Sequence, residues 1–156
     1  MGGKLGKVLE PYRDVGTLCL RLAIGIIFMA HGSQMLFGLF GGGGLAETAK
    51  GFASMGFQPG LFWGTLAAAT QFFGGLAVLV GFATRLAALL LGVVMVVAMV
   101  KVHLPYGFFL NFMLKPGVGH GIEYNVALLG GCLALLFGGP GKHSLECSAC
   151  ECKERG

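Results

Sequence analysis

Long apolar runs constrain this chain more than any other feature. Four runs, at residues 15–40, 61–82, 86–104 and 123–137, contain few charged side chains. A helix needs about 20 residues, each rising 1.5 Å, to cross a bilayer. Lipid also requires every backbone polar group to be paired within the protein, which selects helices. The sequence therefore predicts an all-α integral membrane bundle of four transmembrane helices, the fourth being the shortest.

The composition excludes two other classes of protein. Hydrophobic residues make up 55% of the chain and charged residues only 12%, whereas a soluble domain carries about 25% charged residues. No alternating strands of a membrane barrel are present. The net charge of +4 is not gathered into a basic stripe with aromatic residues, so we expect a lipid environment and no nucleic acid.

The chain divides into three predicted parts. Residues 1–14 form an N-terminal segment, residues 15–140 the membrane domain, and residues 141–156 a cysteine-containing tail. The first apolar run is too long for a cleaved signal peptide, and no small-x-small cleavage site follows it. We therefore expect this run to remain as the first helix.

The basic residues predict the orientation. With four spans, one side carries both termini and eight basic residues, which are Lys4, Lys7, Arg13, Arg21, Arg85, Lys142, Lys153 and Arg155. The other side carries three, which are Lys50, Lys101 and Lys115. The positive-inside rule then places both termini in the cytoplasm of a bacterial-type inner (plasma) membrane.

Two long connections lie on the opposite, outer side. In the first, Leu45, Ala49 and Phe52 share one helical face, which predicts a short amphipathic helix on the membrane surface. The second, residues 101–121, is aromatic and is interrupted by Pro105 and Pro116, which favours a loop or re-entrant cap.

Polar residues on three different elements are predicted to converge near the outer side. They are His31 and Gln34 on the first helix, His103 at the end of the third, His120 in the loop, and Glu123 and Tyr124 at the start of the fourth. Arg21 and Gln71 are expected deeper in the membrane. Ionisable groups within a membrane face a cavity or pair with one another. The convergence therefore predicts a site inside the bundle.

Small residues mark the helix contacts expected around this site. On the fourth helix the predicted packing face comprises Glu123, Ala127, Gly130 or Gly131, and Ala134. On the third it comprises Gly92, Met95 or Val96, Met99 and His103.

Each polar residue also has a structural interpretation. Arg21 can extend its charge to the interface, and Gln71 can donate a hydrogen bond between helices. Tyr124 can belong to an aromatic belt. His103 and His120 can be interfacial residues with hydrated rings.

Three stretches resemble the DoxX family. They are LRLAIGIIFMAHGSQMLFG, QFFGGLAVLVGFATRLAAL and GIEYNVALLGGCLALLFGGPGKHSLE, and the resemblance extends over residues 15–146. The family-pattern positions are Arg21, His31, Gly32, Gly81, Arg85, His103, Glu123 and Gly139. The chain departs from the family pattern at Gln71, where members often carry Glu, and at Met35, where they often carry a basic residue.

The resemblance implies a small four-helix inner-membrane protein. Related DoxD-type proteins are linked to thiosulfate oxidation with quinone as electron acceptor, and other members to membrane redox and oxidative-stress complexes. Many members have no established activity. We therefore expect a quinone-linked component of a membrane redox system, with non-catalytic scaffold or assembly partner and small-solute passage as alternatives.

A quinone site requires apolar walls and donors near the ring oxygens. Phe28, Phe108, Phe109 and Phe112 are candidate walls. Candidate catalytic residues are His31 and His103 as donors and Glu123 as the proton-transfer group. Candidate ring-binding residues are Arg21, Gln34, Gln71, His120 and Tyr124.

No cofactor is certain from the sequence. It shows no haem, flavin or iron–sulfur motif, so electrons would come from a small reductant or from other redox subunits. A homo-oligomer is a further possible assembly. Two His residues on different helices leave haem or metal ligation as a lesser alternative.

The tail carries Cys147, Cys150 and Cys152 in the spacing C-x-x-C-x-C. These thiols could bind zinc or copper, with His143 as a fourth ligand, or act as a redox pair. The alternative is a tail with incidental thiols.

Overall fold

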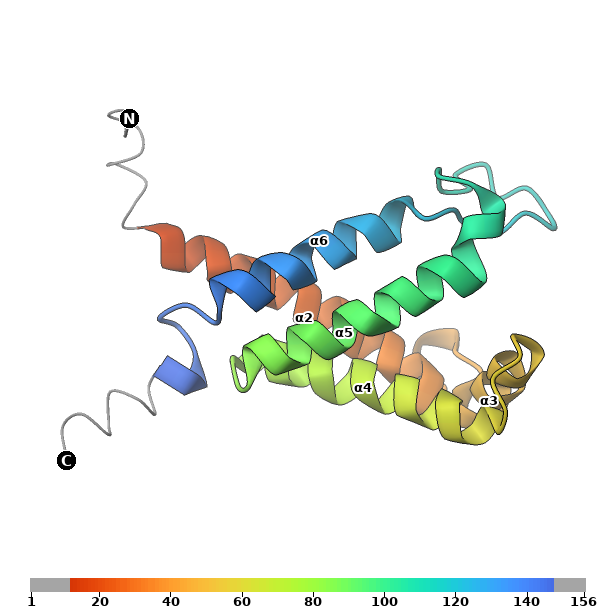
Figure 1. The fold of residues 1–156 in the computed structure, drawn as a ribbon, viewed down its shortest axis with the longest axis horizontal. Coiled ribbons are helices and arrows are strands. Elements are labelled where there is room, and N and C mark those ends of the chain that lie inside the picture. Colours follow the sequence, from red (N-terminus) through yellow and green to blue (C-terminus); the bar gives the residue numbers. More distant parts are fainter. Residues whose placement is uncertain (1–11, 148–156) are drawn as a thin grey trace.

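The computed structural model describes residues 12–147, and these residues form helices and loops without any strand (Figure 1). The main helices are α2 (Arg13–Phe37), α4 (Gly60–Val80), α5 (Thr84–Ala98) and α6 (Glu123–Gly138). A π-helical turn at Met99–His103 and a short turn at Leu104–Tyr106 extend α5. The predicted all-α fold class is thereby confirmed.

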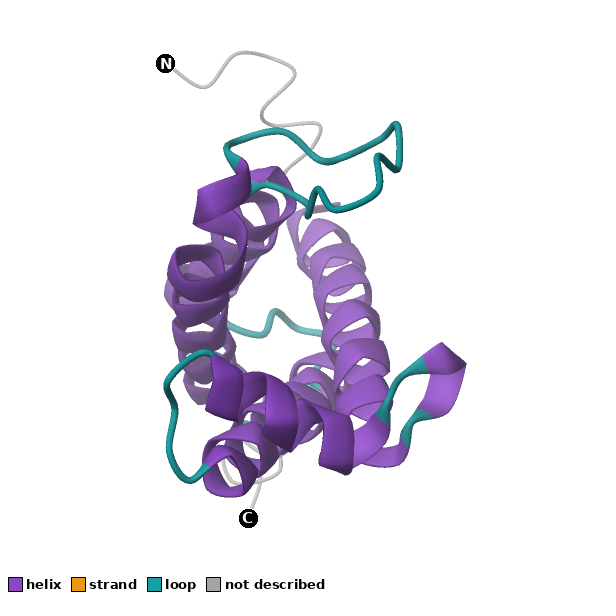
Figure 2. Cartoon of the chain, turned by 90° about the vertical axis from the view of Figure 1, so that its right-hand side faces the viewer, coloured by secondary structure: helices purple, strands orange, loops and turns teal. Residues whose placement is uncertain are grey.

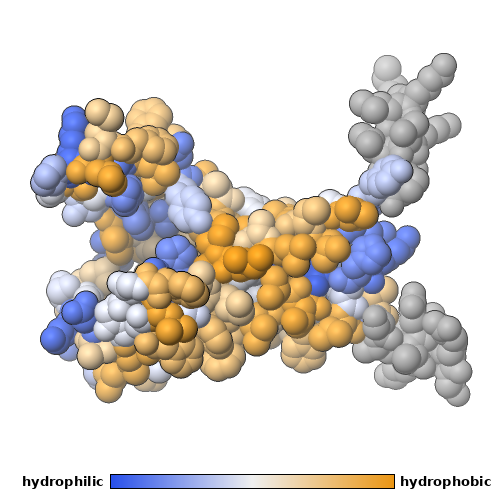
Figure 3. Space-filling view, turned by 180° about the vertical axis from the view of Figure 1, so that it is seen from behind, coloured by the Kyte–Doolittle hydropathy of each residue, from blue (hydrophilic) through white to orange (hydrophobic). Residues whose placement is uncertain are grey.

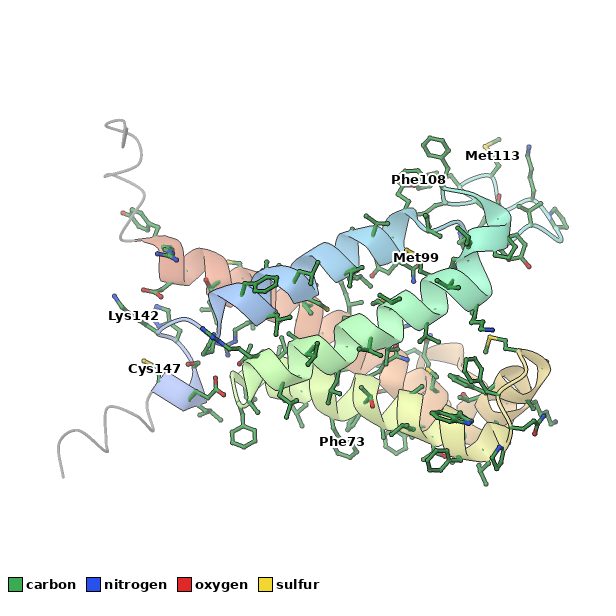
Figure 4. All side chains as sticks on the ribbon, viewed as in Figure 1. Phe73, Met99, Phe108, Met113, Lys142 and Cys147 are labelled. Carbon is green, nitrogen blue, oxygen red and sulfur yellow. The ribbon has the colours of Figure 1, made fainter. Side chains whose placement is uncertain are left out.

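Three of these helices are long and apolar enough to cross a membrane: α2, α4, and α5 with its extension to Tyr106. The fourth, α6, has 16 residues, which at 1.5 Å per residue is about 24 Å. It is the shortest of the four when α5 is counted with its extension, which then has 23 residues, as the sequence predicts. Large apolar side chains cover the outside of the helices (Figure 3). Phe73, for example, points away from the bundle (Figure 4).

The predicted amphipathic helix is also present. Helix α3 (Gly44–Ser54) follows a short turn at Leu39–Gly41 and packs against α4 and α2. We call the end of the bundle that carries α3 and residues 104–122 the loop end. The opposite end, where α2 begins and α6 finishes, is the terminal end (Figure 1).

The four main helices form a ring when viewed from the loop end (Figure 2). Helix α2 packs along α4, α4 along α5, α5 along α6, and α6 back against α2. Glycines allow the closest of these contacts. A Cβ atom on Gly32 would lie 2.4 Å from the backbone nitrogen of Phe72, and one on Gly75 would lie 2.6 Å from that of Met29. Such small residues let helix backbones approach within a membrane.

An apolar core occupies the middle and the terminal half of the bundle. Phe28 of α2, Val78 of α4, Leu91 of α5 and Leu135 of α6 are fully buried there. Toward the loop end the core gives way to the cavity described below.

The predicted packing face of α6 is confirmed at Gly131, where a Cβ would lie 2.6 Å from Ile24 Cδ1 of α2, and is wrong at its other positions. The buried residues are Asn125, Leu128, Cys132 and Leu135, whereas Ala127, Gly130 and Ala134 are exposed. The cause is the rotation imposed at the start of the helix. The Glu123 carboxylate accepts a hydrogen bond from the Leu110 amide, and the Glu123 amide donates one to the Phe108 carbonyl oxygen. The side of α6 that carries Glu123 therefore faces the preceding loop. The prediction for α5 is confirmed at Gly92 and Met95, which are buried.

Candidate functional site

A cavity of about 860 Å³ lies within the loop-end half of the bundle. Its floor is formed by Phe28, Met95 and Leu128, which also belong to the apolar core. In Figure 3 the loop end, at the left, is visibly hollowed between its upper and lower parts. The polar side chains that line the cavity are His31, Thr70, Gln71, Lys101, His103, Asn111, His120, Tyr124 and Asn125.

The cavity brings together five of the predicted site residues. They are His31 of α2, Gln71 of α4, His103 at the end of α5, His120 of the loop and Tyr124 of α6. The sequence placed Gln71 deeper than the others, but it reaches the same cavity. Elements separated by up to 93 positions in the chain thus contribute to one site.

Gln34 and Glu123 do not line the cavity. The Gln34 amide donates a hydrogen bond to the Phe40 carbonyl oxygen at 3.2 Å. The Glu123 carboxylate accepts one from the Leu110 amide at 3.1 Å. Both side chains hold local backbone in place: Gln34 orders the end of α2, and Glu123 attaches the loop to α6.

Arg21 lies in a separate position at the terminal end. Its side chain is 2% exposed, and its guanidinium donates to the carbonyl oxygens of Val78 at 2.9 Å and Leu79 at 2.8 Å. It also donates to Pro140 at 3.1 Å and to His143. Arg21 therefore connects α2 to the end of α4 and to the segment after α6.

His103 and His120 use their Nδ1 atoms in opposite ways. Nδ1 of His103 lies 2.8 Å from the His120 carbonyl oxygen, and since that oxygen only accepts, the His103 Nδ1 carries a proton. The Asn111 backbone N–H donates to His120 Nδ1 at 3.3 Å, so that nitrogen is unprotonated. Nδ1 of His103 thus donates a hydrogen bond and Nδ1 of His120 accepts one.

His31 differs from both, because it makes no hydrogen bond or ion pair with any described residue. It is exposed, and it projects from α2 one turn from the buried Phe28. Its two ring nitrogens are thus available to a ligand in the cavity.

Two amides that line the cavity have only thioether partners among the described residues. Gln71 Nε2 donates to Met35 Sδ at 3.0 Å, and Asn125 Nδ2 lies 3.8 Å from Met95 Sδ. Neither amide oxygen has a hydrogen-bond partner in the described chain, and neither is fully enclosed. Both oxygens therefore remain able to accept hydrogen bonds from a ligand.

Sequence reasoning missed Asn125, Lys101 and Asn111. Asn125 lies within the fourth apolar run, where a side-chain amide is as unusual as the carboxylate of Glu123. The charge of Glu123 makes it the stronger candidate from the sequence alone. Asn111 orders the loop: its side chain bonds the Lys115 and Val118 carbonyl oxygens and the Lys115 amide. The cap expected from the prolines and glycines of residues 101–121 agrees with the structure, since Leu110, Asn111 and Phe112 of this loop line the cavity.

Comparisons with known proteins decide the family. The sequence model of the DoxX family matches residues 16–104. The chain belongs to the DoxX family. It is 31% identical over 145 residues to the uncharacterized membrane protein Rv3486 of Mycobacterium tuberculosis, covering 90% of this chain and 85% of that protein.

A second relative has a redox name. The chain is 34% identical over 98 residues to a Bacillus subtilis protein named "Putative oxidoreductase CatD", covering 63% of this chain and 67% of that protein. No solved structure matches the chain.

Six of the eight DoxX-pattern residues fall into two groups in the structure, the others being Gly32 at the α2–α4 contact and Glu123 at the loop. At the terminal end, each pattern arginine lies beside a glycine of positive φ. A Cβ on Gly81 would be 2.5 Å from Arg21 Nη2, and one on Gly139 would be 3.2 Å from Arg85 Nη2. These glycines leave room for the guanidinium groups. His31 and His103 belong to the second group, at the cavity.

The predicted metal site of this DoxX protein falls mostly outside the described residues. Cys150 and Cys152 lie beyond residue 147, while Cys147 is described at the terminal end (Figure 4). Within residues 12–147 no group of three His, Cys, Asp or Glu side chains could hold a metal ion. The preceding segment packs against the bundle, since the Glu146 amide donates to the Gly81 carbonyl oxygen at 3.1 Å.

Proposed function

We propose that the cavity binds a quinone or quinol and that the protein is a quinone-linked component of a membrane redox system. The observation that carries this proposal is the cavity itself. Its volume of about 860 Å³ falls within the range of about 300–1,000 Å³ for small-molecule sites. It combines an apolar floor with polar side chains from α2, α4, α5 and α6.

The chemistry of the lining suits a ring with oxygens at opposite ends. Phe28 and Phe112 line the cavity, whereas Phe108 and Phe109, the other expected walls, do not. His31 would donate a hydrogen bond to one ring oxygen and exchange the proton that accompanies reduction or oxidation. The Gln71 and Asn125 amide oxygens would accept from the hydroxyl groups of a quinol. Glu123 is less suited to proton transfer, since its carboxylate is bound to Leu110.

Two observations disfavour the alternatives. A solute passage needs a polar path from Gln71 to Arg21, but the fully buried Phe28, Val78 and Leu91 form the core on the terminal side of the cavity. A pure scaffold would satisfy its polar groups internally, yet His31 and two amide oxygens lack partners among the described residues. The name of the CatD relative adds support for redox chemistry.

The location in the membrane and the source of electrons are part of the same proposal. The basic-residue distribution supports an inner-membrane location with both termini cytoplasmic. Electrons would come from a partner subunit or from a small reductant, in sulfur-compound oxidation or in an oxidative-stress response. The ring would occupy the half of the bundle away from the cytoplasm.

A binding experiment tests the proposal directly. The only tryptophan of the chain, Trp63, lines the cavity, so a bound quinone should quench its fluorescence. The protein in nanodiscs is titrated with a naphthoquinone. We expect saturable quenching in the wild type and affinity about tenfold lower in His31→Ala, the equivalent of about 1.4 kcal/mol.

Gln34→Ala is the matched control. It changes a polar residue one turn from His31 on the same helix but outside the cavity lining, and should leave the affinity unchanged. Unsaturable quenching, or equal affinity in His31→Ala and wild type, would overturn the proposed site. Quinone-pool reduction in membranes with thiosulfate, with and without the protein, then tests the sulfur-compound route.

A further inference from the structure

The charges around the cavity are unbalanced. Lys101 and three histidines line it, but no carboxylate does so among the described residues. Those residues contain four acidic side chains. Asp14 and Glu146 are at the terminal end, Glu47 is in the first turn of α3, and the Glu123 carboxylate is bound to Leu110.

Lys101 has no anionic partner within the described chain. The ion pair found there joins Lys142 to Asp14 at 3.3 Å, at the other end of the bundle. The recorded contact of the Lys101 ammonium is the Phe57 ring, whose centroid lies 5.7 Å away. Phe57 also lines the cavity, so this cation–π contact joins two of its walls near the loop end.

The Lys101 side chain is exposed at the edge of an apolar cavity, where it contacts the Phe57 ring and faces no carboxylate of the described residues. Charges within membrane proteins pair with a counter-charge or contact water; water can hydrate the exposed Lys101 ammonium when no ligand is bound, and an anionic ligand would supply a counter-charge there. The floor of Phe28, Met95 and Leu128 would accept only the apolar part of such a ligand. The cavity thus has an apolar inner part and a basic rim.

We infer that the cavity prefers an amphipathic anion, with an apolar body and an ionised hydroxyl or carboxylate head, over a neutral ligand, and that Lys101 binds the head. This inference rests on the proposed quinone site and specifies the class of quinone: one with an acidic ring hydroxyl. A fatty acid shares the same chemistry. The apolar body extends toward Phe28, and the head remains at the rim near His103 and His120.

The test compares two naphthoquinones that differ in one group. One carries an alkyl chain and an acidic ring hydroxyl, and the other is its methyl ether, which cannot ionise. Both are titrated against the full-length protein in nanodiscs with Trp63 quenching as the readout. We expect the hydroxyl compound to bind about tenfold more tightly than the ether.

Lysine variants test whether the charge of Lys101 causes the preference for the hydroxyl compound. Lys101→Met keeps the length of the side chain without the charge, and should reduce the preference to less than about twofold. Lys101→Arg should retain it, and so should Lys115→Met, which removes a loop charge outside the cavity lining. Near-identical circular dichroism and melting of the variants would show that the fold is intact; if Lys101→Met does not fold, the hydroxyl–ether comparison in the wild type and Lys101→Arg decides.

The outcomes separate the two proposals. Equal binding of both naphthoquinones overturns the anion preference and leaves the quinone site standing. If neither binds but a brominated fatty acid quenches Trp63 in a Lys101-dependent manner, the anion preference stands and the quinone function falls. If none of the three binds, both proposals are overturned.

Discussion

The amide nitrogen of Gln71 lies 3.0 Å from the thioether sulfur of Met35, across the seam between α4 and α2. Sulfur is a weak acceptor, so this buried amide has a partner of low strength while its oxygen remains available to the cavity. Such an arrangement costs stability that a purely apolar pair would not. An amide that binds a ligand would explain why a polar residue occupies this buried position.

Replacing Gln71 with Leu should therefore affect binding more than folding. Hydrogen bonds between transmembrane helices contribute about 0.6 kcal/mol on average, and we expect the unfolding free energy to change by less than about 1 kcal/mol. Naphthoquinone affinity should fall about tenfold. Thermal unfolding in detergent and Trp63 quenching measure the two effects. A large loss of stability with unchanged affinity would show that Gln71 is only a packing residue.

Glu123 provides a test between a proton-transfer role and a positioning role. Glu123→Gln keeps an oxygen that can accept the Leu110 hydrogen bond, so loop structure and ligand binding should remain near wild type. Glu123→Ala removes the acceptor and should increase hydrogen exchange at Leu110 and in the loop that follows. Loss of redox turnover in Glu123→Gln, with binding and exchange unchanged, would instead restore the proton-transfer role predicted from the sequence.

Arg21 should be essential for stability, because it donates four hydrogen bonds to carbonyl oxygens from a buried position. Arg21→Met removes the donor to the Leu79, Pro140 and His143 oxygens, while the Val78 oxygen keeps the Gly81 amide, and each unsatisfied buried group costs about 1–3 kcal/mol. We expect a loss of at least about 3 kcal/mol. Arg21→Lys should recover little, since an ammonium lacks the forked geometry.

The measurement for Arg21 is chemical unfolding in detergent, together with hydrogen exchange in residues 139–147. Arg13→Met is the control, because Arg13 is an exposed residue at the start of the same helix. Wild-type exchange in that segment after Arg21→Met would contradict the assignment of Arg21 as the connection between α2 and the C-terminal segment.

The close contact between α2 and α4 predicts that the stability of the bundle depends on the glycine at position 32. An alanine at position 32 would place its Cβ 2.4 Å from the Phe72 backbone nitrogen, so the helices must separate. Overpacking of this kind costs about 1–3 kcal/mol. Gly130→Ala is the control, since a Cβ there meets nothing within 4 Å, and its stability should change by less than about 1 kcal/mol. Equal melting of the two variants would contradict the close approach.

Much of the architecture could be predicted from hydropathy. The boundaries expected for the fourth helix, 123–137, agree with the observed Glu123–Gly138 to within one residue. The amphipathic helix at α3 was also predictable from the spacing of Leu45, Ala49 and Phe52. These features depend on local periodicity and on the exclusion of unpaired backbone groups from lipid, and the sequence contains both.

The membership of the site was less predictable. Glu123 and Asn125 are two positions apart, which is about 200° around a helix, so only one of them can face the bundle. The sequence favours Glu123 because it is charged. In the structure Asn125 faces the bundle, because the Leu110 amide of the loop binds the Glu123 carboxylate and thereby sets the rotation of α6.

The sequence by itself determined that this chain forms apolar helices for a bilayer, in an order and with a glycine, arginine and histidine pattern characteristic of the DoxX family. Only the tertiary structure decided which polar residues meet. It joined His31, Gln71, Lys101 and Asn125 around one cavity and moved Arg21 into a structural role. The physical reason is that helix formation depends on neighbours in the chain, whereas helix rotation and the path of the loop depend on contacts between residues far apart in it.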